Sequence, residues 1–593
     1  MKNLSNNFKL RFTVPLLLMA TLGLWACKKN FMDAHPYGQY ATEQIQTKAG
    51  IDIVLIGAYG AIDGESQFKY GENWFATATN WVFGDIASDD TYKGTDANDQ
   101  PLMTAVEIYN WLPNNSSFMT RWTAIYDGIA KANTTLKLLA STKEVNPSEV
   151  TEAYEKEIKA ECRFIRGWQH FEAKRMWNNI PYMSDTTTVP DNTAAGNADN
   201  VWKLIEADFQ FAYDNLPADG KQSAPGRPNK WAAYAYLGKA KLYQGLYAEA
   251  LPIFTKVINE GTTWDGTPYA LLPAYWQNFD ARYKNKSESV FAIQYAASGS
   301  QEGDGSRGYG LAFPYGGDFG CCGFMQPSVN LVNSYQTDAN GLPKANPQNT
   351  PVKNDQGIKS DEPFTLGTEN MDPRVDWSAG RRSVPFYDWG PHPGYLWIRD
   401  QGYAGPFSPK KHIYSQADKA EGLIATGWRN VTSKNYNAMR FADVLLMAAE
   451  CEVEAGSLAN AQKYVDMVRK RAEDPGSWVK DSPAKYVIKT YAEAGDVTTF
   501  ADKAKAREAV RNERRFELAM EGSRWFDLMR YSVPNGPTPT YLEDVLNAYV
   551  SKEKDLRGYL KSANTVGTKN HYYPIPEREI TLAKGTLKQN DGY

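Results

Sequence analysis

The sequence predicts a mainly α-helical fold, in which a scaffold of helical hairpins carries a large, loop-rich insertion with short β-strands. Apolar residues recur at helical spacing over most of the chain, and two hairpin patterns share the same arrangement of small and apolar residues. Residues 260–435 lose this spacing and are rich in Gly, Pro, Trp and Tyr. The chain has 593 residues, whereas single cores stop growing at roughly 250–300 residues. We therefore expect stacked helical units.

The first 26 residues have the pattern of a secretory signal peptide. Three basic residues and no acid precede an apolar run of 14 residues, Phe12 to Trp25, which is too short to cross a hydrocarbon layer of about 30 Å as a helix. The end of this run, LGLWAC, is similar to the bacterial lipobox, whose cysteine is lipidated before cleavage. We predict that Cys27 becomes the lipidated N-terminus, with a plain secreted protein or an uncleaved anchor as alternatives. No later apolar run is long enough for a membrane span, so we expect attachment to the membrane through the N-terminal lipid only.

The spacing of small and apolar residues predicts two helical hairpins. Residues 227–259 place Gly238 inside the first helix and Gly245 at the turn, and residues 436–472 repeat the spacing around Gly456. Both resemble a tetratricopeptide unit, in which small residues let two antiparallel helices approach closely. Gly245 and Gly456 are 211 residues apart, so a large insertion separates the two units.

Further helices are predicted by apolar spacing in five runs: residues 51–62, 122–140, 153–177, 201–215 and 501–530. Between the hairpins, residues 260–435 favour turns and long loops, with a short strand at Ser289 to Ala296. Loops held by a rigid scaffold are where binding residues usually lie. We therefore expect a helical scaffold with a loop-rich binding face.

Composition limits the classes of function. The formal net charge is −4, which supplies no cationic field for binding a phosphate backbone, so we expect no nucleic-acid partner. Aromatic residues make up 13% of the chain, with 17 Trp, 36 Tyr and 24 Phe. Aromatic faces of this number suit a binding surface.

Several motifs in fixed order resemble the SusD/RagB family of nutrient-binding outer-membrane lipoproteins of Bacteroidetes. The C-terminal segments YPIPEREI (573–580) and LKQNDGY (587–593) carry the resemblance most clearly. It extends over nearly the whole mature chain through six further segments: RFIRGW (163–168), NIPY (179–182), GRP (226–228), DPRVD (372–376), SPKKH (408–412) and MRFADVLLM (439–447).

The resemblance implies one SusD-like unit over residues 27–593. Its helical scaffold would lie mainly in residues 40–259 and 436–530, its ligand-binding region in 260–435, and a C-terminal segment in 531–593. It also implies an oligosaccharide ligand, or a peptide in some members, and a SusC-like TonB-dependent transporter as partner. The location implied is the outer membrane, facing the cell exterior.

The loop after the first helix holds the first candidate ligand-binding residues. Trp81 offers a flat face to the C–H groups of a sugar, and the carboxylates of Asp63 and Asp90 can accept hydroxyl hydrogens. The alternative is that the tryptophan packs in the core and the aspartates cap turns.

The central insertion holds the second group of candidates. Arg381 and Arg382 can each donate two hydrogen bonds to neighbouring hydroxyls beside the face of Trp389, or they form structural ion pairs instead. Cys321 and Cys322 lie in a Gly-rich loop that permits a bond between adjacent cysteines. Such a disulfide would give a sugar ring a rigid apolar shelf, and two free thiols in a turn are the alternative.

No constellation of catalytic residues stands out. The five histidines are scattered, and no zinc motif, phosphate loop or nucleophile elbow is present. We expect no cofactor, no metal and no catalysis. A glycoside hydrolase stays open as an alternative because it needs only two carboxylates, and a helical-repeat adaptor that binds protein or peptide is the other.

Overall fold

Helices dominate the computed structural model, which describes residues 42–64, 72–189, 194–297, 305–425, 431–532 and 536–593. The long helices are α3 (Lys48–Tyr59), α6 (Ser116–Val145), α7 (Glu152–Trp177), α8 (Val201–Asn215), α9 (Lys230–Leu242), α10 (Tyr247–Glu260), α15 (Phe441–Ala455), α16 (Leu458–Glu473), α17 (Lys503–Leu518), α18 (Arg524–Ser532) and α19 (Tyr541–Glu553). Shorter helices are α2 (Thr42–Ile45), α4 (Asn73–Ala76), α5 (Pro101–Glu107), α11 (Val329–Ser334), α12 (Val375–Ser378), α13 (Gln401–Ala404), α14 (Gln416–Ala420) and α20 (Glu577–Leu582). The predicted fold class is confirmed.

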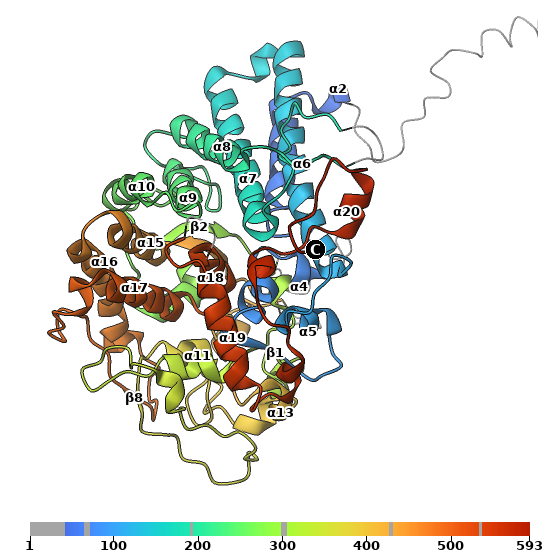
Figure 1. Cartoon of the computed structure of the whole chain (residues 1–593). Helices are drawn as coiled ribbons and strands as arrows, with labels where there is room; N and C mark the ends of the chain where they lie inside the picture. The colour runs from blue at the N-terminus through green and yellow to red at the C-terminus, as the bar shows by residue number, and fades with distance from the viewer. Residues whose placement is uncertain (1–41, 65–71, 190–193, 298–304, 426–430, 533–535) are drawn as a thin grey trace, which may run out of the picture.

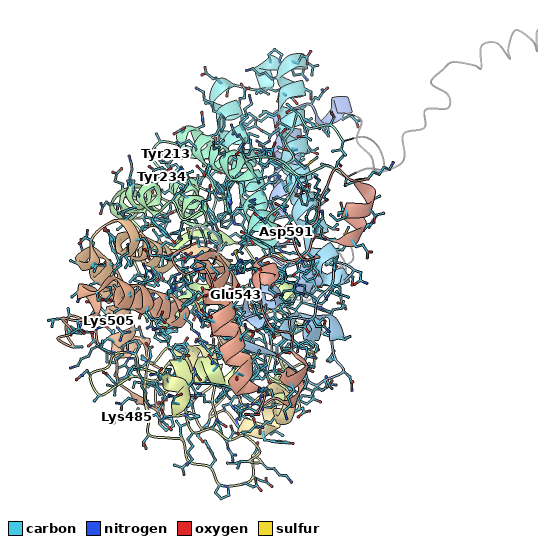
Figure 2. All side chains as sticks on the ribbon, in the orientation of Figure 1. Tyr213, Tyr234, Lys485, Lys505, Glu543 and Asp591 are labelled. Atoms are coloured by element: carbon cyan, nitrogen blue, oxygen red, sulfur yellow. A yellow bond between two sulfur atoms is a disulfide. The ribbon has the colours of Figure 1, made fainter. Side chains whose placement is uncertain are left out.

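The long helices follow one another as stacked hairpins. From α6 to α10 each helix packs on the next in sequence, and α15, α16 and α17 continue the series (Figure 1). Helix α10 packs directly against α15, so the two hairpins predicted from the sequence are neighbours in space although the insertion separates them in the chain. Figure 2 shows Tyr213 and Tyr234 side by side where α8 meets α9, with their rings stacked at 4.1 Å.

Small residues allow this close packing. A Cβ atom at Gly238 of α9 would lie 2.8 Å from the Phe254 ring of α10, so only glycine fits there. Gly245 ends the turn between the two helices with φ +72°, a conformation that glycine adopts without strain.

The strands are short and, within the described residues, form four two-stranded sheets. Three pairs are antiparallel: β1 (Thr91–Gly94) with β3 (Phe324–Pro327), β2 (Ser289–Ile293) with β7 (Tyr436–Arg440), and β5 (Ala379–Gly380) with β6 (Ser408–Pro409). One pair is parallel, β4 (Asn370–Met371) with β8 (Lys485–Tyr486). Three of the pairs join segments that are far apart in sequence, and the pair of β5 with β6 joins two irregular segments of the insertion. The sheets therefore hold loops in place and do not form a core of their own.

A buried network of charges joins the scaffold to the insertion. Glu517 of α17 binds Arg374 of the insertion at 3.0 Å, Arg471 of α16 at 2.5 Å, and Arg440 just before α15. Although burial acts to raise it, the pKa of Glu517 is well below its usual range because the three guanidinium groups stabilise the carboxylate. The network therefore fixes the insertion on the helices.

Within the residues that the structure describes, no helix combines the length and the apolar character needed to cross a bilayer. The predicted signal peptide and Cys27 lie outside the described residues.

Candidate functional site

Two loops that lie more than 200 residues apart in sequence meet at one surface. The pairing of β1 with β3 places Thr95 beside Gly323, whose carbonyl accepts a hydrogen bond from the Thr95 N–H at 2.5 Å. On the other side of the same loop, the Tyr315 N–H donates to the Trp397 carbonyl at 2.9 Å. We call this area the disulfide surface and define it by Asp96, Asp99, Tyr315, Cys321, Tyr395 and Arg399.

An arginine holds the two loops together. The Arg399 guanidinium binds Asp96 at 2.7 Å and Asp99 at 2.8 Å, and it lies 5.7 Å from the centre of the Tyr315 ring. Its side chain is 35% exposed, so N–H groups remain accessible to a hydroxyl. Although partial burial acts to raise it, the pKa of Asp96 is lowered because backbone N–H groups and Arg399 stabilise the carboxylate. At neutral pH the surface therefore presents fixed acceptors and donors.

An aromatic cluster supports the surface from below. We define it as Phe313, Phe319, Phe386, Trp397, Ile413, Tyr414 and Ile424. The Phe319 ring meets Trp397 edge-on at 5.1 Å, and Gly317 lies so close to Trp397 that a Cβ atom would be 2.8 Å from its indole nitrogen. Tyr395 and Leu396 directly precede Trp397 in the chain and are 42% and 64% exposed. An accessible aromatic ring therefore lies two residues from a member of the cluster.

The adjacent cysteines form a disulfide. The structure joins Cys321 to Cys322, with Cys321 half-buried and Cys322 packed into the main core. The sequence left open whether this bond forms.

The first group of predicted ligand-binding residues has structural partners instead. Trp81 is fully buried, and its indole N–H donates to the Gly308 carbonyl at 2.7 Å, so it has no free face for a sugar. Asp90 is fully buried and accepts from Arg515 at 2.7 Å. The predicted contacts of both with a ligand are therefore corrected to core roles. Asp63 is half-buried, and its carbonyl accepts from the Ala78 N–H at 2.7 Å.

The two arginines of the second predicted group also bind protein groups and not a ligand. Arg381 is buried and binds Asp376 through two bonds of 2.7 and 2.8 Å. Arg382 is buried and donates to four backbone carbonyls between residues 358 and 362. Neither guanidinium is available to a sugar in this structure, because each is satisfied by protein groups. Trp389 is half-buried, with its N–H on the Tyr414 carbonyl at 3.0 Å and its ring 5.2 Å from Phe319, so it supports the disulfide surface from the side.

Sequence reasoning missed the residues that line the surface. Asp96, Asp99 and Arg399 lie in polar loops without periodicity, and their pairing spans about 300 residues. The signal available was composition alone, since the run from Thr95 to Asp99 is polar and Tyr395 follows a Pro-Gly turn.

The fold and the surface define a protein of stacked helical hairpins with an irregular, partly aromatic loop face. A family model described as "SusD family" matches residues 287–593, and a second, "Starch-binding associating with outer membrane", matches residues 30–243. The chain therefore belongs to the SusD family, as the resemblance predicted.

Similar proteins extend over the whole chain. A SusD-like protein of Formosa agariphila is 24% identical over 99% of this chain and 100% of its own length. A SusD superfamily protein from Bacteroides vulgatus has the same fold, with a TM-score of 0.67, 18% identity and coverage of 93% of this chain and 100% of its own. Surface glycan-binding protein A from Bacteroides thetaiotaomicron, solved in complex with laminarihexaose, gives a TM-score of 0.62 at 20% identity, covering 91% and 99%.

Proposed function

We propose that this chain is a glycan-binding lipoprotein of the outer membrane, which captures an oligosaccharide on the disulfide surface and delivers it to a SusC-like TonB-dependent transporter. The observation that carries the proposal is the convergence of two loops, polar and aromatic, on one supported surface of a SusD-family chain. The laminarihexaose complex of the Bacteroides thetaiotaomicron protein supports an oligosaccharide as the ligand class.

The chemistry of the surface suits a neutral sugar chain. The exposed ring of Tyr395 can stack on sugar C–H groups, and the half-buried Cys321 side of the disulfide offers an apolar shelf. Arg399 and the free lone pairs of Asp96 and Asp99 can bond to hydroxyl groups. Aromatic faces beside planar donors and acceptors are the usual composition of small-molecule sites.

Anchoring and transfer complete the proposal. Cys27 would carry the lipid, so Cys27→Ala should release the protein from the detergent phase in a partitioning assay. No catalytic role is proposed, and we infer that the glycan is held without cleavage. Analysis of products after long incubation tests this inference, because cleavage that depends on one carboxylate pair would assign the chain to the hydrolases.

The binding proposal is tested by calorimetry on the mature chain with laminarihexaose and a panel of other neutral oligosaccharides. Tyr395→Ala should weaken binding by about thirtyfold, since loss of a stacking aromatic at a hot spot removes about 2 kcal/mol. Tyr213→Ala is the matched control, because this tyrosine lies on the scaffold between α8 and α9 (Figure 2). Equal affinity of Tyr395→Ala and the unmodified protein, or no binding by the whole panel, would contradict the proposal.

A further inference from the structure

A cavity of 570 Å³ lies between the insertion and the turn that follows α16. Its walls come from four separate stretches, residues 276–282, 377–388, 410–418 and 475–480, together with Lys434. It shares no residue with the disulfide surface. We call it the aromatic pocket and define it by Trp276, Trp377, Tyr387, Lys410 and Trp478. A volume of this size is typical of sites that hold small ligands.

Three indole rings in the pocket are fixed by the end of α16 and the turn that follows it. The N–H groups of Trp276, Trp377 and Trp478 donate to the carbonyls of Gly476, Ser477 and Ala472 at 3.0, 2.6 and 3.1 Å. All three rings are half-buried, so they line the cavity and do not fill a core. Because their N–H groups are already satisfied, the rings offer faces and not donors to a ligand. Rings held in advance lose little freedom when a ligand binds.

The pocket also contains a buried amine. Lys410 is 1% exposed, and its Nζ lies 5.0 Å from the centre of the Trp377 ring and 5.5 Å from that of Tyr387. The amine donates to the Pro385 carbonyl at 2.7 Å, and it forms no ion pair with any carboxylate in the part of the chain that the structure describes. Asp376, the acid that acts on it electrostatically, is bound by Arg381 and by the Tyr486 hydroxyl.

The other buried charges around the pocket have partners, and the further lysine on its wall, Lys480, lies exposed to solvent. Arg282 binds Asp280 at 2.9 Å and Asp418 at 3.0 Å, and Asp418 also lies 3.7 Å from Lys434. Asp388 accepts from two backbone N–H groups at the start of α14. Among the described residues, the buried Lys410 amine therefore lacks a carboxylate partner. Burial disfavours its charged form until a ligand supplies an anionic group.

We propose that the aromatic pocket is a second carbohydrate site, specific for an acidic sugar residue whose anionic group pairs with Lys410 while its ring stacks on Trp276 and Trp377. A uronate carboxylate and a sulfate ester share this chemistry. The site does not depend on the disulfide surface, and it would let the protein hold acidic glycans as well as neutral ones.

The test is calorimetry on the mature chain with four acidic probes: oligogalacturonate, oligoglucuronate, alginate oligomers and a sulfated galactan oligomer. Methyl-esterified oligogalacturonate is the uncharged match for the first probe. At least one acidic probe should bind, and the carboxylate and sulfate probes show which source of charge the pocket prefers. Lys410→Met should lower that affinity at least tenfold, and Trp276→Ala should do the same.

Matched controls come from a second lysine beside a tryptophan. Lys174 lies 5.9 Å from the Trp202 ring on the scaffold, so Lys174→Met and Trp202→Ala should leave the affinity unchanged. Tyr395→Ala should also leave it unchanged, which separates this site from the disulfide surface. Lys410→Arg keeps the charge and should retain binding to the acidic probe even if Lys410→Met folds poorly.

Three results would overturn the proposal. They are the absence of binding by all four acidic probes, binding of the methyl ester as tight as that of the acid, and an affinity that Lys410→Met and Trp276→Ala do not change. Failure of laminarihexaose to bind would bear only on the disulfide surface.

Discussion

Replacement of Trp81 by alanine distinguishes a core residue from a ligand contact. Trp81 is fully buried, and its N–H bonds to the Gly308 carbonyl across 227 positions of sequence. Removal of a buried tryptophan side chain typically destabilises a protein by about 3–5 kcal/mol. The Gly308 carbonyl left without its donor adds about 1 kcal/mol. We therefore expect the free energy of unfolding to fall by about 4–6 kcal/mol.

The change in thermal midpoint follows from the size of the chain. An unfolding entropy of about 2.1 cal/mol/K per residue gives about 1.2 kcal/mol/K for roughly 550 folded residues, so Trp81→Ala should lower the midpoint by about 3–5 °C. Trp81→Phe fills part of the cavity and should lower it less. Calorimetric scans measure the midpoint, and titration with laminarihexaose at 20 °C measures binding of the folded variant. An unchanged midpoint together with lost binding would refute the assignment of Trp81 to the core.

Two further predictions concern the buried charges. Glu517→Gln should lower the free energy of unfolding by about 3 kcal/mol at pH 7, the low end of the range for a broken buried ion pair, because three buried guanidinium groups each lose one carboxylate partner and keep another. Because the pKa of Glu517 is lower in the folded protein than in the unfolded chain, its carboxylate stabilises the fold above the unfolded pKa of about 4.3, and this stabilisation is lost as the pH falls. Denaturant titrations should therefore show a smaller difference in unfolding free energy between Glu517→Gln and the unmodified protein at pH 3 than at pH 7. Burial lowers the pKa of Lys410 to about 7, with Asp376 and Arg381 as the charged groups that also act on it. Relative to Lys410→Met, the unmodified protein should therefore gain stability as the pH rises from about 7 to about 10, the unfolded lysine value, and denaturant titrations that show the opposite slope would contradict this prediction.

The hairpins could be predicted from sequence because their signals are local. Gly238 and Gly245 contact residues of the same hairpin, so their roles can be inferred from nearby sequence. In the structure Gly238 lies at the contact between the two helices and Gly245 lies in the turn, as the pattern predicts. The contact between α10 and α15 could not be predicted in the same way, because the spacing within each hairpin does not determine whether the insertion between them brings the two hairpins together.

The roles of the loop side chains could not be predicted for a physical reason. A loop has no periodicity that separates a buried face from an exposed face, so Trp81 and Tyr395 look equally suitable for binding until the fold buries the first and exposes the second. The ion pair of Arg381 with Asp376 had a local signal, because the two residues are five positions apart. The pairing of Arg399 with Asp99 had none.

The disulfide surface and the aromatic pocket lie against the same aromatic cluster. Tyr387 of the pocket packs on Phe386 at 5.8 Å, Phe386 packs on Phe319 at 5.9 Å, and Phe319 lies two residues before Cys321. Edge-to-face packing of this kind resists small displacements because interiors are close to crystal density. The substitution Phe386→Ala, which leaves a cavity in the cluster, should therefore weaken binding at both sites, and its effect could not be assigned to one of them. Tyr395 and Lys410 are not members of the cluster, although the Lys410 amine lies 5.6 Å from the Phe386 ring. Titration of each variant with both the neutral and the acidic probe therefore assigns its effect to the surface or to the pocket.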